Sequence, residues 1–260
     1  MSKILAITNQ KGGVGKTTTT VNLAASLAAT NQRVLLIDLD PQGNATMGSG
    51  IDKRDLQASV YDVLLGSKTI AQARIRSEAG KYDMLAANRE LAGAEVELVG
   101  MPNREMRLRD AVRNVAGEYD FVLIDCPPAL NLLTLNGLCA AKSVMIPMQC
   151  EYYALEGLSD LVNTIRKVRA NLNPDLEIEG LLRTMFDPRN SLAQQVSDQL
   201  LEHFGSKVYR TVIPRNVRLA EAPSYGLPAL YHDKLSKGTQ AYLALAGELL
   251  NNAAQPAATV

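Results

Sequence analysis

A glycine-rich segment with two lysines and two threonines lies near the start of the chain. Lys11-Gly12-Gly13-Val14-Gly15-Lys16-Thr17-Thr18 joins an apolar run to a segment of helical periodicity. Glycines ahead of a helix N-terminus leave free backbone N–H groups that can surround a polyphosphate. In this motif the last lysine reaches the β- and γ-phosphates, and the next hydroxyl binds Mg²⁺. We therefore expect the whole segment to bind nucleotide, with Lys16 on the phosphates and Thr17 directly on the metal.

Acidic side chains follow two further apolar runs. Asp38 and Asp40 come after residues 34–37, and Asp125 comes after residues 121–124. Carboxylates in such places can hold Mg²⁺ or position an attacking water. We expect Asp125 to hold the metal through a bound water. For Asp38 two roles remain open, a second-shell place around the metal or a structural part at the strand end.

The elements that must position these side chains follow from the hydrophobic pattern. Runs without polar alternation are typical of parallel strands that are covered by helices on both faces. Alternation of such strands with helices predicts an α/β fold with a doubly wound, mostly parallel sheet, whose ligands bind at the carboxyl ends of the strands. The expected strands are Ile4–Thr8, Val34–Ile37, Phe121–Ile124, Val144–Pro147, Leu181–Phe186 and Val208–Ile213, and the expected helices include Thr17–Ala29, Leu155–Asn171 and Ser191–Phe204.

Length and composition limit the possible classes of protein. The 260 residues, 47% hydrophobic and 21% charged, have enough apolar material for one packed domain. We expect that domain to span residues 1–250, with a frayed tail over residues 251–260. Because 27 basic and 27 acidic side chains cancel, nucleic-acid binding would require basic residues gathered on one face.

The cysteines and the apolar segments indicate a location. Cys126, Cys139 and Cys150 lack the paired spacing of a zinc or iron–sulfur site, so we expect buried, reduced thiols. No secretory signal precedes the first strand, and no apolar run approaches the ~20 residues that span a bilayer. These features predict a cytoplasmic protein without a membrane partner.

One departure from the usual phosphate loop carries a family resemblance. Gln10 replaces the usual first glycine, and Lys11 stands beside Gly12. The chain thus resembles the deviant Walker A class of P-loop ATPases, in which the extra lysine crosses a dimer interface to the partner's nucleotide. The resemblance implies a homodimer with ATP between the subunits, and a close backbone approach at Gly12. It also assigns catalysis to Lys11, Lys16 and Asp40, with Asp40 orienting the attacking water; a merely solvated Lys11 is the alternative.

Three strings narrow the resemblance to the ParA/Soj partition ATPases. They are Asn9 to Thr18, Asp38 to Thr46 and Pro214 to Pro223. The family implies an ATPase of low intrinsic turnover with ATP and Mg²⁺ as cofactors. It also implies that Met185, Pro214 and Asn216 border the adenine. A ParB-like centromere-binding partner would stimulate hydrolysis.

The same resemblance implies binding of double-stranded DNA without sequence preference by the ATP dimer, and hence a nucleoid-associated protein. Arg189 and Arg218 match the arginines concerned, and Arg215 is a further candidate. From charge alone, these basic residues could instead form a solvated face that does not bind DNA. The basic residues between 181 and 220 are Arg183, Arg189, Lys207, Arg210, Arg215 and Arg218, against Asp187, Asp198 and Glu202.

Other members of the superfamily fit the sequence less well. A MinD-like positioning ATPase needs a basic amphipathic C-terminal helix, whereas Asn251–Val260 has no basic residue and contains Pro256. A cluster-carrying ATPase needs paired or bridging cysteines, and a ligase on this fold needs a second substrate motif. No helix-turn-helix precedes the first strand, so operator-specific repression is not expected.

Overall fold

A single mixed sheet forms the centre of the molecule. The computed structural model describes residues 2–254. Seven strands lie in the order β3-β4-β2-β5-β1-β6-β7, and every neighbouring pair is parallel except β3 with β4. The strands are β1 Lys3–Ile7, β2 Val34–Asp38, β3 Ile75–Ser77, β4 Tyr82–Leu85, β5 Phe121–Asp125, β6 Ser143–Gln149 and β7 Glu177–Thr184.

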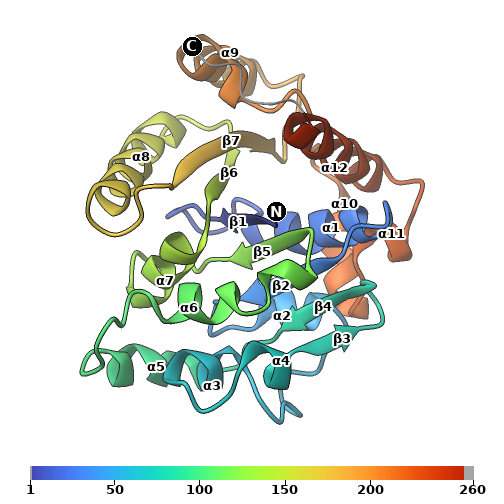
Figure 1. The fold of residues 1–260 in the computed structure, drawn as a ribbon. Helices are drawn as coiled ribbons and strands as arrows, with labels where there is room; N and C mark the ends of the chain where they lie inside the picture. Colours follow the sequence, from blue (N-terminus) through green and yellow to red (C-terminus); the bar gives the residue numbers. More distant parts are fainter. Residues whose placement is uncertain (1, 255–260) are drawn as a thin grey trace.

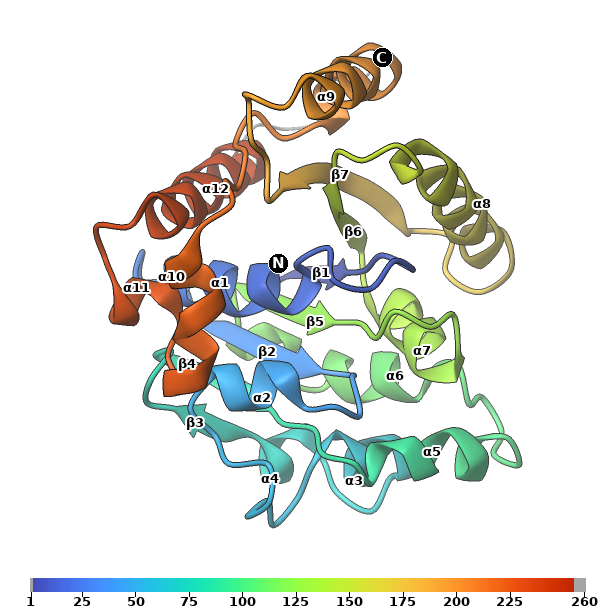
Figure 2. The same cartoon turned by 180° about the vertical axis from the view of Figure 1, so that it is seen from behind.

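Helices cover both faces of this sheet (Figures 1 and 2). One face carries α1, α10, α11 and α12, and the other carries α3 and α5 to α9. The doubly wound α/β fold expected from the sequence is thereby confirmed. The helices are α1 Lys16–Ala28, α2 Asn44–Gly48, α3 Val60–Leu65, α4 Ile70–Ala73, α5 Leu91–Leu98, α6 Arg107–Arg113, α7 Leu132–Ala140, α8 Ala154–Asn171, α9 Ser191–Phe204, α10 Val217–Glu221, α11 Ala229–His232 and α12 Lys237–Ala254, with short 3₁₀ turns at 116–118, 205–207 and 222–225.

The strands are apolar throughout because alternate side chains enter two different cores. In β1, Ile4 and Ala6 pack into one core, whereas Leu5 and Ile7 pack into the other. This two-sided burial explains why the sequence shows continuous apolar runs. It also fixes the register, because a slip of one residue would exchange the two side-chain sets. In that register Ile7 and Asp38 both lie opposite Asp125.

The expected strand over Val208–Ile213 is wrong. Tyr209 N donates to Leu181 O at 3.0 Å, and Ile213 N donates to Arg183 O at 2.9 Å. The segment advances by four residues, from Tyr209 to Ile213, while β7 advances by two, from Leu181 to Arg183. The extra residues therefore bulge away from the sheet. Only isolated bridges form, at Val208 and Pro214.

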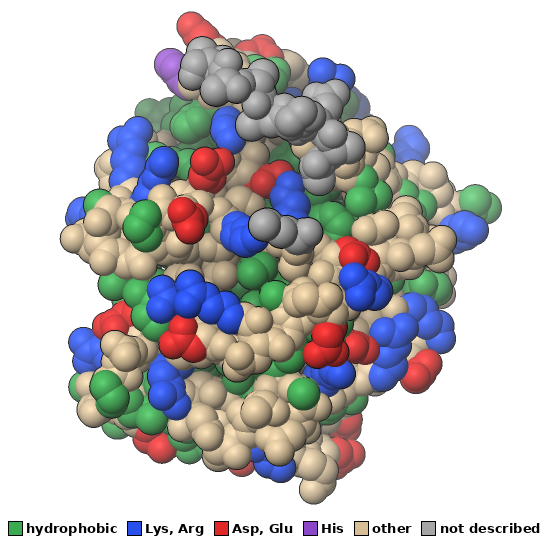
Figure 3. Space-filling view, in the orientation of Figure 1, with side chains coloured by type: hydrophobic (Ala, Val, Ile, Leu, Met, Phe, Trp, Pro, Cys, Tyr) green, Lys and Arg blue, Asp and Glu red, His purple; other side chains and the backbone are tan. Residues whose placement is uncertain are grey.

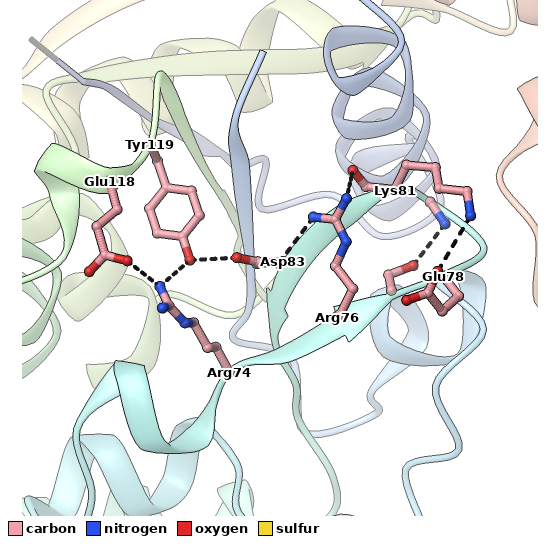
Figure 4. A network of polar contacts seen from close by, with 9 residues as sticks. Arg74, Arg76, Glu78, Lys81, Asp83, Glu118 and Tyr119 are labelled. Atoms are coloured by element: carbon pink, nitrogen blue, oxygen red, sulfur yellow. Dashed lines mark hydrogen bonds and ion pairs between the residues drawn. The ribbon is translucent and has the colours of Figure 1, made fainter. Parts of the chain in front are cut away.

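The antiparallel edge of the sheet, β3 with β4, was not recognised in the sequence because both strands are very short. A polar network fastens this edge to the 3₁₀ turn before β5 (Figure 4). Arg74 donates to Glu118 and to the Tyr119 hydroxyl, each at 2.7 Å. Tyr119 in turn donates to Asp83 at 2.8 Å, and Arg76 pairs with Asp83 across the two strands. Charged side chains on a short edge strand also oppose pairing with another chain.

The C-terminal part of the chain is helical further than the sequence suggested. α12 continues through Asn251 to Ala254. The rest of the expected tail, residues 255–260, lies outside the described residues. The long helices α1, α8 and α9 begin and end within one residue of the expected bounds.

Candidate nucleotide site

The phosphate loop is built around backbone that only glycine adopts easily. Gly13 and Gly15 have φ of +75° and +87°, and Gly15 precedes α1 without any side-chain cap. The first N–H groups of α1 therefore remain available to a ligand. A Cβ placed on Gly12 or Gly13 would meet no atom within 4 Å, so this part of the loop faces open space.

Lys16 folds back over this loop. Its Nζ donates to the carbonyl oxygen of Lys11 at 3.1 Å, and its side chain is buried. Burial lowers the pKa of Lys16, whereas the nearby charges of Asp125 and Asp40 raise it in part. The lysine thus lies with both carboxylates at the carboxyl edge of the sheet, as the sequence predicted from three separate strand ends.

A buried carboxylate lies beside the helix hydroxyls. Thr17 Oγ1 donates to Asp125 Oδ2 at 2.7 Å, and Thr20 Oγ1 donates to Asp125 Oδ1 at 3.0 Å. Burial, and then the charge of Asp38, raises the pKa of the Asp125 carboxyl. A divalent cation would relieve this penalty, so the arrangement fits Mg²⁺.

The donor set also fits the way proteins hold magnesium. Within residues 2–254 no three His, Cys, Asp or Glu side chains form a complete metal cage. Mg²⁺ characteristically takes one or two protein ligands and completes its shell with water and substrate phosphates. Thr17 and Asp125 supply such a partial set next to the phosphate loop.

Asp38 holds the segment that follows β2. Its Oδ2 accepts from both Thr46 N and Thr46 Oγ1, and its Oδ1 accepts from Asp40 N at 3.0 Å. The carboxyl is fully buried, which raises its pKa above the usual range despite these donors. Of the two roles left open by the sequence, these contacts favour the structural one.

Asp40 begins a tight turn that leads into α2. Its Oδ1 accepts from Gln42 N at 2.9 Å, and its carbonyl accepts from Gly43 N at 2.8 Å. Gly43 has φ of +61°, and a Cβ there would lie 2.6 Å from the carbonyl oxygen of Ala87. Only glycine fits this corner, which turns the chain from Asp40 into α2.

Lys11 does not point into its own phosphate loop. Its Nζ pairs with Glu151 Oε2 at 2.5 Å, and both side chains are about half exposed, at 48% and 51%. Glu151 follows the end of β6, on the same edge of the sheet as the phosphate loop. The side chain is therefore free to reorient toward a second molecule at modest cost, since exposed ion pairs contribute only about 0–1 kcal/mol.

A small cavity adjoins the phosphate loop. Its volume is about 110 Å³. Thr184 Oγ1 donates to Val14 O at 2.8 Å and so joins the end of β7 to the loop. Met185 follows with φ of +49°, an unusual conformation for this residue type. The cavity is lined by Gly15, Thr18, Thr184, Met185, Ile213, Pro214, Asn216, Leu219, Ala220 and Tyr242, which brings together the three residues expected at the adenine.

The candidate DNA-binding arginines lie on the surface in two places. Arg189 pairs with Asp187 at 2.7 Å in the loop after β7, and Arg215 lines the same small hollow as Asp187. Arg218, on α10, pairs instead with Glu221 and Asp233. On the face drawn in Figure 3, basic and acidic side chains alternate without a continuous basic field.

Arg183, counted among the basic residues of this stretch, does not belong to a surface. It is buried between β7 and α9, where it donates to Ser197 Oγ and to the carbonyls of Tyr209 and Arg210. These contacts hold the segment that leaves the sheet after Val208. Arg183 therefore has a structural role, and the basic cluster inferred from the sequence is smaller by one charge.

Two contacts of the site were missed in the sequence. Thr20 lies three residues after Thr17, so the helical repeat places both hydroxyls on one face toward Asp125. Glu151 lies 140 residues from Lys11, and only its position after a strand end could have drawn attention to it. Cys126, Cys139 and Cys150 are free and buried, as expected.

Comparisons with known proteins identify the family of the chain. A family model described as an AAA domain matches residues 2–178. The sporulation initiation inhibitor protein Soj of Bacillus subtilis is 54% identical, over 97% of this chain and 100% of its own length. The chromosome partitioning protein ParA of Myxococcus xanthus is 53% identical, over 96% of this chain and 88% of its own. The chain belongs to the ParA/Soj family of chromosome-partitioning ATPases.

Solved structures extend the comparison. A cobyrinic acid a,c-diamide synthase from Mycobacterium smegmatis with bound ADP and magnesium superposes with a TM-score of 0.86 at 39% identity, covering 98% of this chain and 96% of the other. The cell division ATPase MinD of Pyrococcus furiosus gives 0.80 at 24% identity, covering 97% and 100%, which shows a shared fold. Among the described helices, none combines the length and apolar character that a bilayer crossing requires.

Proposed function

We propose that this ParA/Soj ATPase is a nucleotide-controlled DNA-binding switch that segregates DNA. In this proposal Mg-ATP closes a homodimer through Lys11, the dimer binds double-stranded DNA without sequence preference, and hydrolysis assisted by Asp40 releases it. The observation that carries the proposal is the meeting of Lys16, Thr17 and Asp125 at one edge of the sheet. Such an edge responds to the presence of a γ-phosphate.

ATP and Mg²⁺ are the ligands of this site. The free N–H groups at the start of α1 and the Lys16 ammonium would hold the phosphates, and Thr17 with Asp125 would hold the metal. The metal supplies charge that neutralises the phosphate oxygens during transfer. One of the three N–H donors of Lys16 bonds the carbonyl of Lys11, so the other two would be available to the phosphates.

An apolar surface near Lys11 supports the dimer. Tyr152 and Tyr153 are 73% and 69% exposed and follow β6, while Leu130, after β5, is 50% exposed. Exposed large apolar groups that gather on one edge are typical of an interface. A second subunit placed here would cover them and bring its own Lys11 toward the nucleotide.

DNA binding is assigned to Arg189, Arg218 and Arg215. All three are exposed and lie after the last strand, and a dimer would present each of them twice. Because such arginines contact phosphates rather than bases, binding is independent of sequence and sensitive to salt. A protein that binds DNA in this way is nucleoid-associated within the cytoplasm. A ParB-like partner is proposed to stimulate ATP hydrolysis, because a dimer that stays on DNA until its ATP is hydrolysed needs a low intrinsic rate of hydrolysis.

Two other functions have weaker support. The synthase structure at 39% identity speaks for a ligase, but the ParA and Soj relatives are 53–54% identical over nearly the whole chain. MinD resembles the chain at 24% identity, which shows a shared fold alone. We place both below the partition switch.

Binding to a non-specific DNA duplex tests the proposal. The wild type, Lys16→Ala and Asp40→Ala are each measured with ATP, with ADP and without nucleotide. The switch predicts binding with ATP alone, none in Lys16→Ala, and prolonged binding in Asp40→Ala. Dimers that form with ATP but ignore DNA would contradict it, as would binding that is equal in all nucleotide states.

A further inference from the structure

A histidine close to Arg218 has a buried ring nitrogen without a hydrogen-bond partner. His232 ends α11, its side chain is 15% exposed, and its Nε2 is buried and unpaired within residues 2–254. A buried polar atom without a partner costs free energy, so its place in the structure needs an explanation. The other histidine of the chain, His203, is exposed on α9 and has no such surroundings.

The Nε2 atom of His232 faces a carboxylate oxygen that already has a partner. Glu221 Oε2 lies 3.7 Å from this nitrogen and accepts a hydrogen bond from Arg218 Nη1 at 2.8 Å. The imidazole ring stacks on Tyr225, with the ring centroids 4.8 Å apart and the planes at 27°. At 3.7 Å a neutral imidazole makes no hydrogen bond to the carboxylate, whereas a protonated one is attracted by its charge. One oxygen thus lies between a guanidinium and an imidazole.

The surroundings of His232 offer one acid at ion-pairing distance. α11 packs against α1, α10, α12 and the 3₁₀ turn at 222–225. The acids on these elements, or next to His232 in the chain, are Glu221, Asp233 and Glu248. Asp233 pairs with Arg218, and Glu248 accepts from the backbone N–H groups of residues 210 and 211. The other titratable groups there are Lys16, Arg218, Tyr225, Tyr231, Lys234, Lys237 and Tyr242. Among the described residues, no second acid therefore competes with Glu221 for a protonated His232.

Arg218 can leave Glu221 by turning its side chain, without any movement of the backbone. The side chain is 53% exposed, and its second partner, Asp233 Oδ2, lies 3.3 Å from Nε. Exposed ion pairs contribute little each, so a DNA phosphate can take the place of both carboxylates. Glu221 would then lose the guanidinium but would still face His232 Nε2. A proton on that nitrogen restores a cation beside the carboxylate.

We propose that His232 is a proton-binding site coupled to DNA binding, whose imidazolium replaces the guanidinium at Glu221 when Arg218 moves to a DNA phosphate. Each subunit then takes up to one proton from solvent as the complex forms. Without DNA the guanidinium neutralises Glu221 and disfavours a second cation beside it, so His232 binds its proton more tightly in the complex. By linkage, DNA affinity rises as the pH falls through the range in which histidine side chains ionise. The inference rests on the proposed function, because it takes DNA to be bound through Arg218.

The test is the DNA affinity of the ATP dimer as a function of pH. The full chain carrying Asp40→Ala is loaded with Mg-ATP and titrated with a non-specific duplex from about pH 5 to 8, the range of histidine ionisation. Ionic strength is constant, and dimer concentration is matched by light scattering. We expect a higher affinity at the acidic end by about two- to fivefold for each subunit, the range of one exposed ion pair. The rise should disappear when His232→Gln is added and persist when His203→Gln is added.

Two carboxylates provide a further matched pair of variants. Glu221→Gln removes the charge that faces His232, so it should abolish the pH dependence; this position is 40% exposed, and the variant carries the test if His232→Gln does not fold. Asp233→Asn removes the other anion of Arg218, so it should raise the affinity at every pH and preserve the pH dependence. Burial also raises the pKa values of Asp38 and Asp125, but both residues are present in every variant.

The outcomes are distinct for the inference and for the proposed function. A DNA affinity that does not change with pH, or a pH dependence that survives in His232→Gln or in Glu221→Gln, overturns the role of His232 and leaves the switch intact. Loss of the pH dependence in His203→Gln or in Asp233→Asn shows a general effect of charge and also overturns it. If the ATP dimer binds no DNA at any pH, or binds equally after Arg218→Ala, the proposed use of Arg218 fails and the role of His232 fails with it.

Discussion

The phosphate edge and the arginine surface are built in opposite ways. At the phosphate edge Asp125 is buried and accepts hydrogen bonds from residues more than 100 positions away. At the arginine surface Arg189 pairs with an aspartate two positions away, and Arg218 pairs with a glutamate three positions away. The first arrangement exists only in the folded sheet, whereas the second requires little more than a local turn.

The two regions therefore differ in how strongly their charged groups interact. Buried charges interact strongly and tolerate few changes, because a removed partner leaves a desolvated group without compensation. Exposed ion pairs are screened by salt and contribute little each, so they can exchange one partner for another. The edge is thus suited to recognise one ligand, and the surface to bind and release a large anion.

Two lysines of the phosphate loop give the largest expected effect. Lys16→Ala removes a buried cation and should weaken ATP binding by about 100-fold, in line with ~1.5–3 kcal/mol for a charged hydrogen bond and additional loss of neutralisation. Lys11→Ala, at an exposed position, should leave ATP binding by the monomer within about twofold. Titration with a fluorescent ATP analogue checks both. Equal losses in the two variants would erase the distinction between buried and exposed lysines.

Two buried aspartates sharpen the comparison within the phosphate edge. Asp38→Asn replaces one carboxylate oxygen by an NH2 donor, which then faces the backbone N–H of Asp40 or of Thr46. The substitution should lower the free energy of unfolding by about 1–3 kcal/mol, or roughly 2–4 °C in Tm per kcal/mol. Asp125→Asn keeps partners, because Thr17 and Thr20 hydroxyls can also accept. Asp125→Asn removes a buried charge, so the free energy of unfolding without nucleotide should stay equal or rise. Mg²⁺-dependent binding of ATP should be lost.

Calorimetry of both variants without nucleotide and magnesium measures this contrast. A large loss of stability in Asp125→Asn would show that its carboxylate stabilises the fold, contrary to a site kept for a metal. A Tm of Asp38→Asn equal to that of the wild type would remove the structural role of Asp38.

Substitutions of two arginines give the smallest expected effects. They separate an exposed arginine proposed to bind DNA from a buried arginine that stabilises the fold. Arg189→Ala should lower DNA affinity a few-fold and reduce the slope of log K against log salt by about 2 in the dimer, one per phosphate contact. Its Tm should not change. Arg183→Ala should instead lower the free energy of unfolding by about 1–3 kcal/mol, because the carbonyls of Tyr209 and Arg210 lose their donor. Binding isotherms over a salt series, with a Tm for each variant, test the division.

Much of the phosphate edge could be predicted from the sequence. The loop from Lys11 to Thr18 has a fixed spacing, and apolar runs before Asp38 and Asp125 indicate buried parallel strands. Because parallel strands end at a common edge, the meeting of these residues follows from the fold class alone. The structure adds Thr20, which a stricter use of the helical repeat could have found.

The surface could be predicted less well, because charge in a sequence does not reveal burial. Arg183 follows the same basic pattern as Arg189, yet it lies under α9 and holds the segment after Val208. The expected strand over 208–213 failed for a related reason. Its apolar residues suit a strand, but tertiary contacts draw the backbone away from β7. The ion pair between Lys11 and Glu151 likewise depends on distant strand ends.

The central claim is that hydrolysis at the phosphate edge ends DNA binding at the arginine surface. The most direct test is the rate at which DNA leaves the preformed ATP complex after free ATP is removed, measured beside the rate of hydrolysis. The account predicts that the two rates agree in the wild type and that Asp40→Ala slows both by about 100-fold or more, the range for loss of a group that positions a proton transfer. Equally rapid DNA release from Asp40→Ala and wild type would contradict it.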